Sequence, residues 1–354
     1  MSLIQSLPAG SLDIVGDIHG EYDALQSLLN HLGYDQTGSH PDGRSLVFVG
    51  DFCDRGPNSP AVLALAQRLV QSGKAVAVLG NHEINLLREE AKDGSGWFFD
   101  SRKIRDREKY EPYHRPTAQE RSQIVAFLNS LPIALEREDL RIVHAAWETA
   151  QIDLVRALPI GSFRESYDEW EKAAQRYAVE TALEKRMTAD LEKWEHDLEN
   201  QNLTPPFLHA LAEHEANKQM MNPLKVLTSG VERKSKDSAP FYSSGKWRFV
   251  ERVQWWDEYD EACPVVIGHY WRRVHKIDRS AIGKGDPDLF QNMAPNAWHG
   301  KHRNVFCVDF SVGGRWTERK ANTPLGVDFK LAALRWPERT LLFDDGHAMA
   351  TQGS

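Results

Sequence analysis

The first ninety residues repeat one pattern three times: a short apolar run, a glycine, a cluster of polar residues and then a stretch with helical spacing. The apolar runs cover residues 12–15, 45–49 and 75–79, and their lengths suit buried strands. Alternating strands and helices are typical of layered α/β domains, in which ligands bind beyond the carboxyl ends of the strands. The sequence therefore predicts an α/β domain with its functional site at one edge of a sheet.

The polar cluster after the first run contains an aspartate and a histidine two positions apart, Asp17 and His19. Where a chain leaves the end of a strand, side chains at positions i and i+2 can converge on one point. A carboxylate and an imidazole that converge form half of a metal site. Because an aspartate at a strand end is more often a helix cap or a turn residue, this cluster alone does not establish a metal site.

Four further predicted strands also end in side chains that can bind metals. Asp51 follows the second strand, Asn81 and His82 follow the third, and two later strands end in His144 and His269. Taken singly, each residue is explained as a cap, a turn residue or a packed histidine. Because the strands of one sheet bring their ends together, however, the whole set would meet at one edge. Such a set is too large for one zinc ion and suits two borderline cations such as Mn²⁺, Fe or Zn²⁺.

Composition limits the partners of the chain. Its 354 residues are 41% hydrophobic and 27% charged, as in ordinary globular proteins. The formal net charge of −8 argues against a protein that coats nucleic acid or an anionic membrane, so we expect no stable nucleic-acid partner. The negative charge does not exclude a phosphorylated substrate, because bound metal cations would make the local electrostatic field positive.

Several signals favour a cytoplasmic protein. The three cysteines, Cys53, Cys263 and Cys307, form no Cys-x-x-Cys pair, which fits a reducing compartment. The amino terminus has no basic residue ahead of a long apolar run, so we expect no cleaved signal peptide. No uninterrupted apolar segment approaches the length that spans a bilayer, and we expect no membrane partner.

The composition of the sequence changes over about residues 161–222, where apolar residues recur at helical spacing among Glu, Lys, Asp and Gln. This pattern predicts one or two amphipathic helices. We expect them to form a cap-like insertion in a single domain over residues 1–354. A substrate-facing cap and a solvated helical arm without a functional role fit the pattern equally well.

Three other segments lack periodicity and are predicted to be loops: residues 94–116, 230–248 and 278–303. After the first of them, a capping-box pattern from Thr117 to Glu120 predicts the start of a helix. Near the carboxyl end, apolar runs at 330–334 and 340–343 predict a hairpin that completes a sheet.

The order and spacing of the polar motifs point to a family. The motifs read GDIHG at residues 16–20, GDFCDRG at 50–56 and GNHE at 80–83, followed by His144 and by a Gly-His pair that ends at His269. This set resembles the calcineurin-like metallophosphoesterases. The Asp-Arg-Gly and Asn-His-Glu segments are most similar to the phosphoprotein phosphatase branch, which includes serine/threonine phosphatases and bacterial diadenosine tetraphosphatases. The resemblance implies a four-layer α/β/β/α sandwich of two mixed sheets, with a dinuclear metal site at its rim.

The resemblance also implies which residues bind the two metals. The expected ligands of the first metal are Asp17, His19 and Asp51. Those of the second are Asp51, which would bridge the two ions, with Asn81, His144 and His269. Mn²⁺ is the expected metal, with Fe, Zn, Ni or Co as alternatives. The ions would share a water, acidify it and direct the hydroxide in line at phosphorus, so that no covalent phosphoenzyme forms.

Three residues of these motifs have implied catalytic roles. Arg55 would clamp the phosphate oxygens, because a guanidinium fork matches their geometry. His82 would protonate the leaving oxygen, with Asp54 holding its imidazole. The metal ligand Asn81 would also contact the substrate.

A second phosphate-binding arginine is expected after the fourth strand of the pattern. Arg233, Arg248 and Arg252 are the candidates, and the sequence does not choose among them. Related bacterial enzymes have an Asp-Thr-Gly segment near the position where this chain has Asp309, which we therefore carry over as a further substrate-binding candidate.

These features predict a metal-dependent phosphoric ester hydrolase. Its expected substrate is a phosphomonoester, either a phosphoserine or phosphothreonine protein or a small nucleotide. The alternatives are a symmetrical diadenosine tetraphosphatase and a nucleic-acid-end phosphatase or phosphodiesterase. A non-catalytic scaffold that keeps its metals is a third alternative, which the complete set of catalytic residues disfavours.

A nucleotide substrate would need an aromatic surface on which a base can stack. The aromatic residues in or near segments that could supply it are Trp97, Phe98, Phe99, Trp147, Trp255, Trp256 and Trp298. For any single one of them, simple core packing is the better interpretation. A protein substrate would instead require an open groove, which a large helical insertion would partly close.

Overall fold

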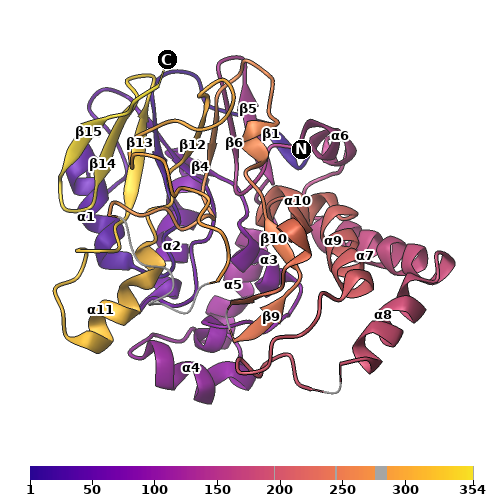
Figure 1. Cartoon of the computed structure of the whole chain (residues 1–354). Helices are drawn as coiled ribbons and strands as arrows, with labels where there is room; N and C mark the ends of the chain where they lie inside the picture. The colour runs from indigo at the N-terminus through magenta and orange to yellow at the C-terminus, as the bar shows by residue number, and fades with distance from the viewer. Residues whose placement is uncertain (195, 244, 276–284, 354) are drawn as a thin grey trace.

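The computed structural model describes residues 1–194, 196–243, 245–275 and 285–353, and two mixed sheets run through it (Figure 1). One sheet has six strands in the order β15-β14-β13-β2-β3-β4. Along the sheet these are Ala348–Ala350, Thr340–Phe343, Ala332–Trp336, Leu12–Val15, Ser45–Phe48 and Ala75–Ala77. The other has five strands in the order β1-β5-β6-β11-β12. These are Ile4–Ser6, Ala134–Arg137, Leu140–Val143, Val265–Ile267 and Val305–Cys307.

The three predicted repeats form the parallel part of the six-stranded sheet, where β2, β3 and β4 pair side by side. Each of these strands is followed by a helix, as the repeats predict: α1 (Tyr22–Leu32), α2 (Ser59–Gln71) and α3 (Asn81–Leu87). The predicted hairpin near the carboxyl end is β13 with β14, and β13 joins β2 in antiparallel register. This addition makes the sheet mixed.

The two sheets pack face to face because their strands alternate apolar side chains between two buried faces. Ile14 and Val47 lie between the sheets, in one apolar cluster with Val266 of the five-stranded sheet. Val15 and Phe48 belong to a second cluster, which packs the outward faces of both sheets against helices that include α1, α2, α6 (Thr149–Val155) and α10 (Pro223–Ser229). This is the predicted α/β/β/α arrangement.

The predicted insertion contains three helices in its described part, one more than expected: α7 (Phe163–Glu180), α8 (Leu183–Glu192) and α9 (His209–Met220). They pack on one another through Ala178, Leu183 and Ala210 and form the lobe at the right of Figure 1. Directly after them, α10 returns to the main body, where the carbonyl of Leu227 accepts the N–H of Ala145. The insertion is therefore tied to the chain beside the end of β6.

Two segments predicted to be loops contain regular structure. Residues 94–116 hold two 3₁₀ turns and α4 (Lys103–Tyr110), and residues 230–248 contain β7 (Glu232–Lys234), β8 (Phe241–Ser243) and β9 (Lys246–Arg248). β7 pairs with β10 (Val250–Arg252), and β8 with β9. These strands are short and mostly half-exposed, so they lack the apolar alternation that reveals a strand in sequence.

Of the third predicted loop, residues 276–284 lie outside the described part, and residues 285–303 form turns with isolated bridges. The remaining α-helices of the described chain are α5 (Ala118–Leu128), which starts with the predicted capping box, and α11 (Arg315–Ala321). Among the described residues, no helix combines the length and the apolar character that crossing a bilayer requires.

Candidate metal centre and active site

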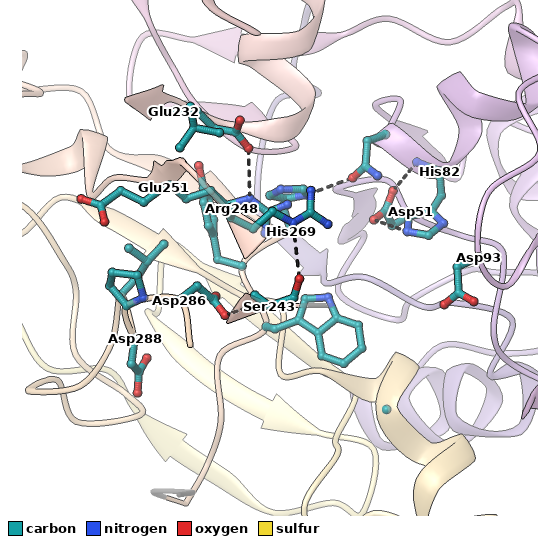
Figure 2. Close-up of a pocket in the computed structure, with 18 of the residues that line it drawn as sticks. Asp51, His82, Asp93, Glu232, Ser243, Arg248, Glu251, His269, Asp286 and Asp288 are labelled. Atoms are coloured by element: carbon teal, nitrogen blue, oxygen red, sulfur yellow. Dashed lines mark hydrogen bonds and ion pairs between the residues drawn. The ribbon is translucent and has the colours of Figure 1, made fainter. Parts of the chain in front are cut away.

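Five strand ends from the two sheets bring their polar residues to one place, and Figure 2 shows Asp51, His82 and His269 around the same pocket. Two buried groups of metal-binding atoms result, and within each group the atoms lie within 4.8 Å of one another. The first group is His19, Asp51 and His82, and the second is Asp51, His144 and His269. Asp51 belongs to both, as a carboxylate between two cations would.

The atoms around His144 fit a cation. Its Nδ1 donates a hydrogen bond of 2.8 Å to the carbonyl of Val49, which leaves the lone pair on Nε2. That nitrogen lies 3.3 Å from Oδ2 of Asp51 and 3.3 Å from Oδ1 of Asn81, which are both acceptors. The Nδ1 of His269 lies 2.9 Å from the same oxygen of Asn81, so that this nitrogen faces the same point. Nitrogen and oxygen ligands of this kind suit Mn²⁺, Fe, Co, Ni or Zn²⁺.

The first strand end faces the same centre. Asp17 is 1% exposed, and its two oxygens accept the backbone N–H of His269 at 3.2 and 3.1 Å. The Nε2 of His19 lies 4.0 Å from the Asp17 carboxylate, while its Nδ1 donates to the carbonyl of Cys53 at 2.9 Å. A backbone carbonyl thus orients both His19 and His144 so that Nε2 points inward, which is the usual support of a metal-binding histidine.

Glycines allow these strand ends to approach closely. A Cβ atom at Gly80 would lie 2.2 Å from Oδ1 of Asp51, and one at Gly268 would lie 2.1 Å from Oδ1 of Asp17. Any other residue at either position would collide with one of these two carboxylates. Gly80 and Gly268 are therefore required by the close packing of the site.

Five of the residues predicted to act in the site adopt a left-handed backbone conformation, which is uncommon for residues other than glycine. The φ angles are 47° at His19, 50° at Asp51, 73° at Asp54, 67° at Arg55 and 70° at His269. Strain of this kind persists only where the surrounding structure imposes it, and it gathers at functional sites.

Glu83 joins the ends of β3 and β4, although we expected no role for it from the sequence. Its buried carboxylate accepts backbone N–H groups from Asp51 at 2.8 Å, Phe52 at 2.9 Å and Gly80 at 3.0 Å. The thiol of Cys53 lies 3.2 Å from the same carboxylate. Glu83 therefore fixes the loop after β3 against the loop after β4. The signal in the sequence was its place in the GNHE motif.

The predicted catalytic residues lie together. Nδ1 of His82 donates to Oδ2 of Asp54 at 2.6 Å, and the indole of Trp97 donates to Oδ1 of the same carboxylate, also at 2.6 Å. The guanidinium of Arg55 contacts Nε2 of His82 at 3.1 Å and Nε2 of His19 at 2.9 Å. Trp97, one of the aromatic residues considered for base stacking, instead holds Asp54 in place.

Burial affects the two aspartates differently. It would raise the pKa of Asp51, but His144 and His82, when protonated, outweigh burial and hold this pKa well below its ordinary value. Burial raises the pKa of Asp17 well above its ordinary value, and the nearby charges of Asp309 and Asp51 raise it further. A cation next to Asp17 would reverse this shift by favouring the ionised carboxylate.

A pocket of about 820 Å³ opens over the centre, and Arg55, Asn81 and His82 are part of its wall. Of the three candidates for the second phosphate clamp, Arg248 and Arg252 line this pocket. Arg233 is not among the lining residues, and its guanidinium forms an exposed ion pair of 2.6 Å with Glu258. The helical insertion contributes Lys218 and Gln219 of α9, so one of its helices faces the site.

Asp309 is not among the residues that line the pocket, and it is 1% exposed. Its carboxylate accepts the backbone N–H groups of Trp271 and Ser311, each at 2.7 Å. The residue carried over as a substrate-binding candidate is thus placed to shape the chain after β11.

The aromatic residues considered for base stacking are buried or lie outside the pocket. Trp97, Trp147, Trp255, Trp256 and Trp298 are each at most 4% exposed, and neither these nor Phe98 and Phe99 line the pocket. Core packing therefore explains them better. The aromatic lining comes instead from Trp271, Tyr110 and Trp316, among others. Sequence reasoning missed these residues, although Trp271 stands two positions after His269.

The fold and the site define the class of this protein, an α/β/β/α phosphoesterase with ligands for divalent metals. The chain belongs to the calcineurin-like phosphoesterase family, whose model matches residues 11–304. This is the family that the motifs resemble, and its members are metal-dependent hydrolases.

Curated relatives share one part of the chain. The asymmetrical bis(5'-nucleosyl)-tetraphosphatase PrpE of Halalkalibacterium halodurans is 51% identical over 79 residues, which is 22% of this chain and 32% of the relative. PrpE of Anoxybacillus flavithermus is 48% identical over 79 residues, with the same coverage. The chain thus spans about a third of the length of these relatives. A cold-active protein-tyrosine phosphatase from a Shewanella species is 17% identical, with a TM-score of 0.46 over 98% of this chain and 83% of the other.

Proposed function

We propose that this protein is a dinuclear-metal-dependent phosphatase that hydrolyses phosphomonoesters, with a small nucleotide as its substrate. The proposal rests mainly on the position of the Asp51 carboxylate. Its carboxylate belongs to both buried groups of metal-binding atoms, and its Oδ2 lies 3.8 Å from Nε2 of His19 and 3.3 Å from Nε2 of His144, which are proposed ligands of the two cations. A carboxylate is suited to this position because it has two oxygens and a charge that offsets two cations.

In this proposal Asp17, His19 and Asp51 hold one cation, and the other is held by Asp51, Asn81, His144 and His269. Two such cations, when bound, would lower the pKa of a water molecule and neutralise phosphate charge. Mn²⁺ is the first choice for this set of nitrogen and oxygen ligands, with Fe, Zn, Ni or Co as alternatives. Because the proposed ligands come from both sheets, we infer that residues 1–354 form one domain with the helical segment inserted in it.

The chain's own residues would bind the phosphate and transfer a proton. Arg55 presents two terminal nitrogens between His19 and His82, a fork that can bind two phosphate oxygens at once. His82 would hold the proton for the leaving oxygen at Nε2, since Nδ1 is bonded to Asp54. Asp54 keeps the imidazole in this orientation. Asn81 contacts the substrate as well as a metal.

We assign the second phosphate clamp to Arg252. It lines the pocket together with His269, and after burial its charge is the main influence that lowers the pKa of His269. Arg248 lies in the same pocket and is the next candidate.

A nucleotide suits the pocket better than a phosphoprotein does. Lys218 and Gln219 reach the pocket from α9, so the helical insertion partly covers the site that a protein segment would have to enter, and Lys225 of α10 also lines the pocket. The names of the PrpE relatives, which describe nucleotide hydrolases, point the same way.

A substrate panel tests the proposal. The Mn²⁺-loaded full chain is assayed with phosphopeptides, mononucleotides, diadenosine tetraphosphate and phosphodiesters, and kcat/KM is compared. We expect the highest values for nucleotides. A preference for phosphopeptides would contradict the nucleotide assignment, and a folded, metal-loaded protein that hydrolyses none of the panel would contradict the phosphatase assignment and favour a scaffold.

A dinucleoside tetraphosphatase is the second candidate function, and the PrpE relatives favour it. Those proteins are named as asymmetrical enzymes, whereas the sequence suggested the symmetrical reaction. The products from diadenosine tetraphosphate separate the two reactions, since asymmetrical cleavage yields ATP and AMP and symmetrical cleavage yields two molecules of ADP.

A further inference from the structure

The pocket has an aromatic wall beside Arg55, formed by Trp271, Tyr110 and Trp316. We propose that this wall is the subsite for the base of a nucleotide substrate. The inference rests on the proposed phosphatase function and adds to it where the organic part of the substrate binds.

Trp271 is the member of the wall next to the phosphate clamp. Its indole centroid lies 4.8 Å from Cζ of Arg55 and 6.2 Å from the ring centroid of His19. Its φ angle is 54°, an uncommon and costly conformation for a bulky residue. The carboxylate of Asp309 supports it by accepting the N–H of Trp271 at 2.7 Å, and the carbonyl of Asp309 accepts the next N–H, from Arg272, at 3.0 Å. The fold therefore holds an indole beside the group that binds phosphate.

Tyr110 and Trp316 continue the wall from two other elements, α4 and α11. Their rings meet edge to face with centroids 5.3 Å apart. The Tyr110 hydroxyl donates to Asp93 at 2.5 Å, and the ammonium of Lys109 lies 2.8 Å from the same carboxylate. The ammonium groups of Lys109 and Lys320 lie 5.1 and 5.8 Å from the centroid of the half-buried Trp316 ring. A base that stacks on this part of the wall would therefore meet an indole flanked by two cations.

The rest of the pocket has a different chemistry. On that side Lys218, Arg248 and Arg252 line the pocket from α9, β9 and β10, and the carboxylates of Glu215, Glu232 and Glu251 lie among them. Because Arg55 lies against the Trp271 indole, a phosphate bound by Arg55 would leave the base of the same substrate beside the aromatic wall. The pocket volume of about 820 Å³ suits a ligand of nucleotide size.

These features favour a nucleoside over a peptide. Aromatic rings combined with nearby cations bind nucleotides through stacking and phosphate contacts, and stacking accepts any base. A phosphopeptide would instead need hydrogen bonds from the wall to its backbone. The hydroxyl of Tyr110 and the ammonium of Lys109 do not supply them, because both are bonded to Asp93.

The test compares a nucleotide with a phosphomonoester that has no base. The Mn²⁺-loaded full chain hydrolyses AMP and ribose 5-phosphate in parallel, and the ratio of the two kcat/KM values is recorded. We expect Trp316→Leu to lower this ratio by about tenfold, mainly through KM for the nucleotide. The conservative Trp316→Phe should recover most of the ratio. Trp170→Leu is the matched control, because Trp170 is a half-buried helical tryptophan outside the pocket.

Each result of this test is informative. A ratio that stays at the wild-type value in Trp316→Leu overturns the base subsite, as does a wild type that shows no preference for AMP over ribose 5-phosphate. In either case, hydrolysis that requires Mn²⁺ leaves the proposed phosphatase function standing. If the metal-loaded wild type hydrolyses neither compound but does hydrolyse another phosphomonoester, the base subsite is wrong; if it hydrolyses no phosphate ester, both proposals are wrong.

Discussion

His82 and Asp54 form a hydrogen bond of 2.6 Å inside the pocket wall, between Nδ1 of the imidazole and Oδ2 of the carboxylate. The other oxygen of Asp54 accepts the indole N–H of Trp97 at 2.6 Å, so the carboxylate is fixed from two sides. Nε2 of His82 is consequently the ring nitrogen that faces Arg55 and the proposed phosphate. This geometry makes His82 the proposed general acid.

Replacing His82 with alanine tests that role. We expect His82→Ala to retain its metals but to lower kcat by about 10² to 10⁴-fold on alkyl phosphates, because their alkoxide leaving groups need a proton. The loss should be smaller on p-nitrophenyl phosphate, whose leaving group departs as a stable anion. Steady-state rates on both substrates, with metal content measured on the same samples, check this prediction. Full activity of His82→Ala on alkyl phosphates would show that another group donates the proton.

The assignment of the second clamp predicts a difference between two arginines. Arg252→Ala should lower kcat/KM for every phosphate substrate by about tenfold or more, because a charge-assisted hydrogen bond is lost. Arg233→Ala is the matched control, since Arg233 forms an exposed ion pair with Glu258 outside the pocket, and it should behave as wild type. Equal effects in the two variants would count against Arg252.

Glu83 should control metal binding without touching a metal. In Glu83→Gln an amide NH₂ replaces one of the oxygens that accept the N–H groups of Asp51, Phe52 and Gly80. We expect metal affinity to fall by about 10- to 100-fold, as for other residues that support metal ligands. Metal titration by calorimetry measures this, with the exposed Glu165→Gln as control. Wild-type affinity in Glu83→Gln would mean that the two loops hold their positions without it.

The burial of His299 leads us to predict that the free energy of unfolding depends on pH. Burial, together with the charge of Arg272, lowers its pKa well below the ordinary 6.5. The unfolded chain binds a proton there below pH 6.5 while the folded protein does not, so this residue reduces stability as the pH falls below 6.5. The slope is at most about 1.4 kcal/mol per pH unit for one group. Urea unfolding in chelator should show a flatter pH profile for His299→Phe than for wild type or for the exposed-residue control His302→Phe. Identical profiles would refute the assignment.

The strand ends could be predicted from sequence because their signal is local. A buried run, a glycine and a polar cluster occur within a few residues, and the glycine is required where Gly80 meets Asp51. The order of the strands in the two sheets was not needed to place these residues together. The same local signals predicted α1, α2 and the capping box of α5, all of which the structure contains.

The second clamp and the aromatic wall could not be predicted in this way. Arg248 and Arg252 lie on strands of three residues, where a shift of one position would turn each side chain to the other face. Trp271 reaches the pocket because its left-handed backbone is bonded to Asp309, 38 residues further along the chain. Long-range contacts of this kind leave no periodic pattern in the sequence.

The central claim is that Asp51 is shared by two divalent cations on which hydrolysis depends. It is tested most directly by adding Mn²⁺ to chelator-treated protein while metal binding and hydrolysis of p-nitrophenyl phosphate are followed together. We predict no activity without metal, activity that rises as about two ions per chain bind, and loss of both binding and activity in Asp51→Asn. Activity that persists in chelator, or folded protein that binds two ions and stays inactive, would contradict the account.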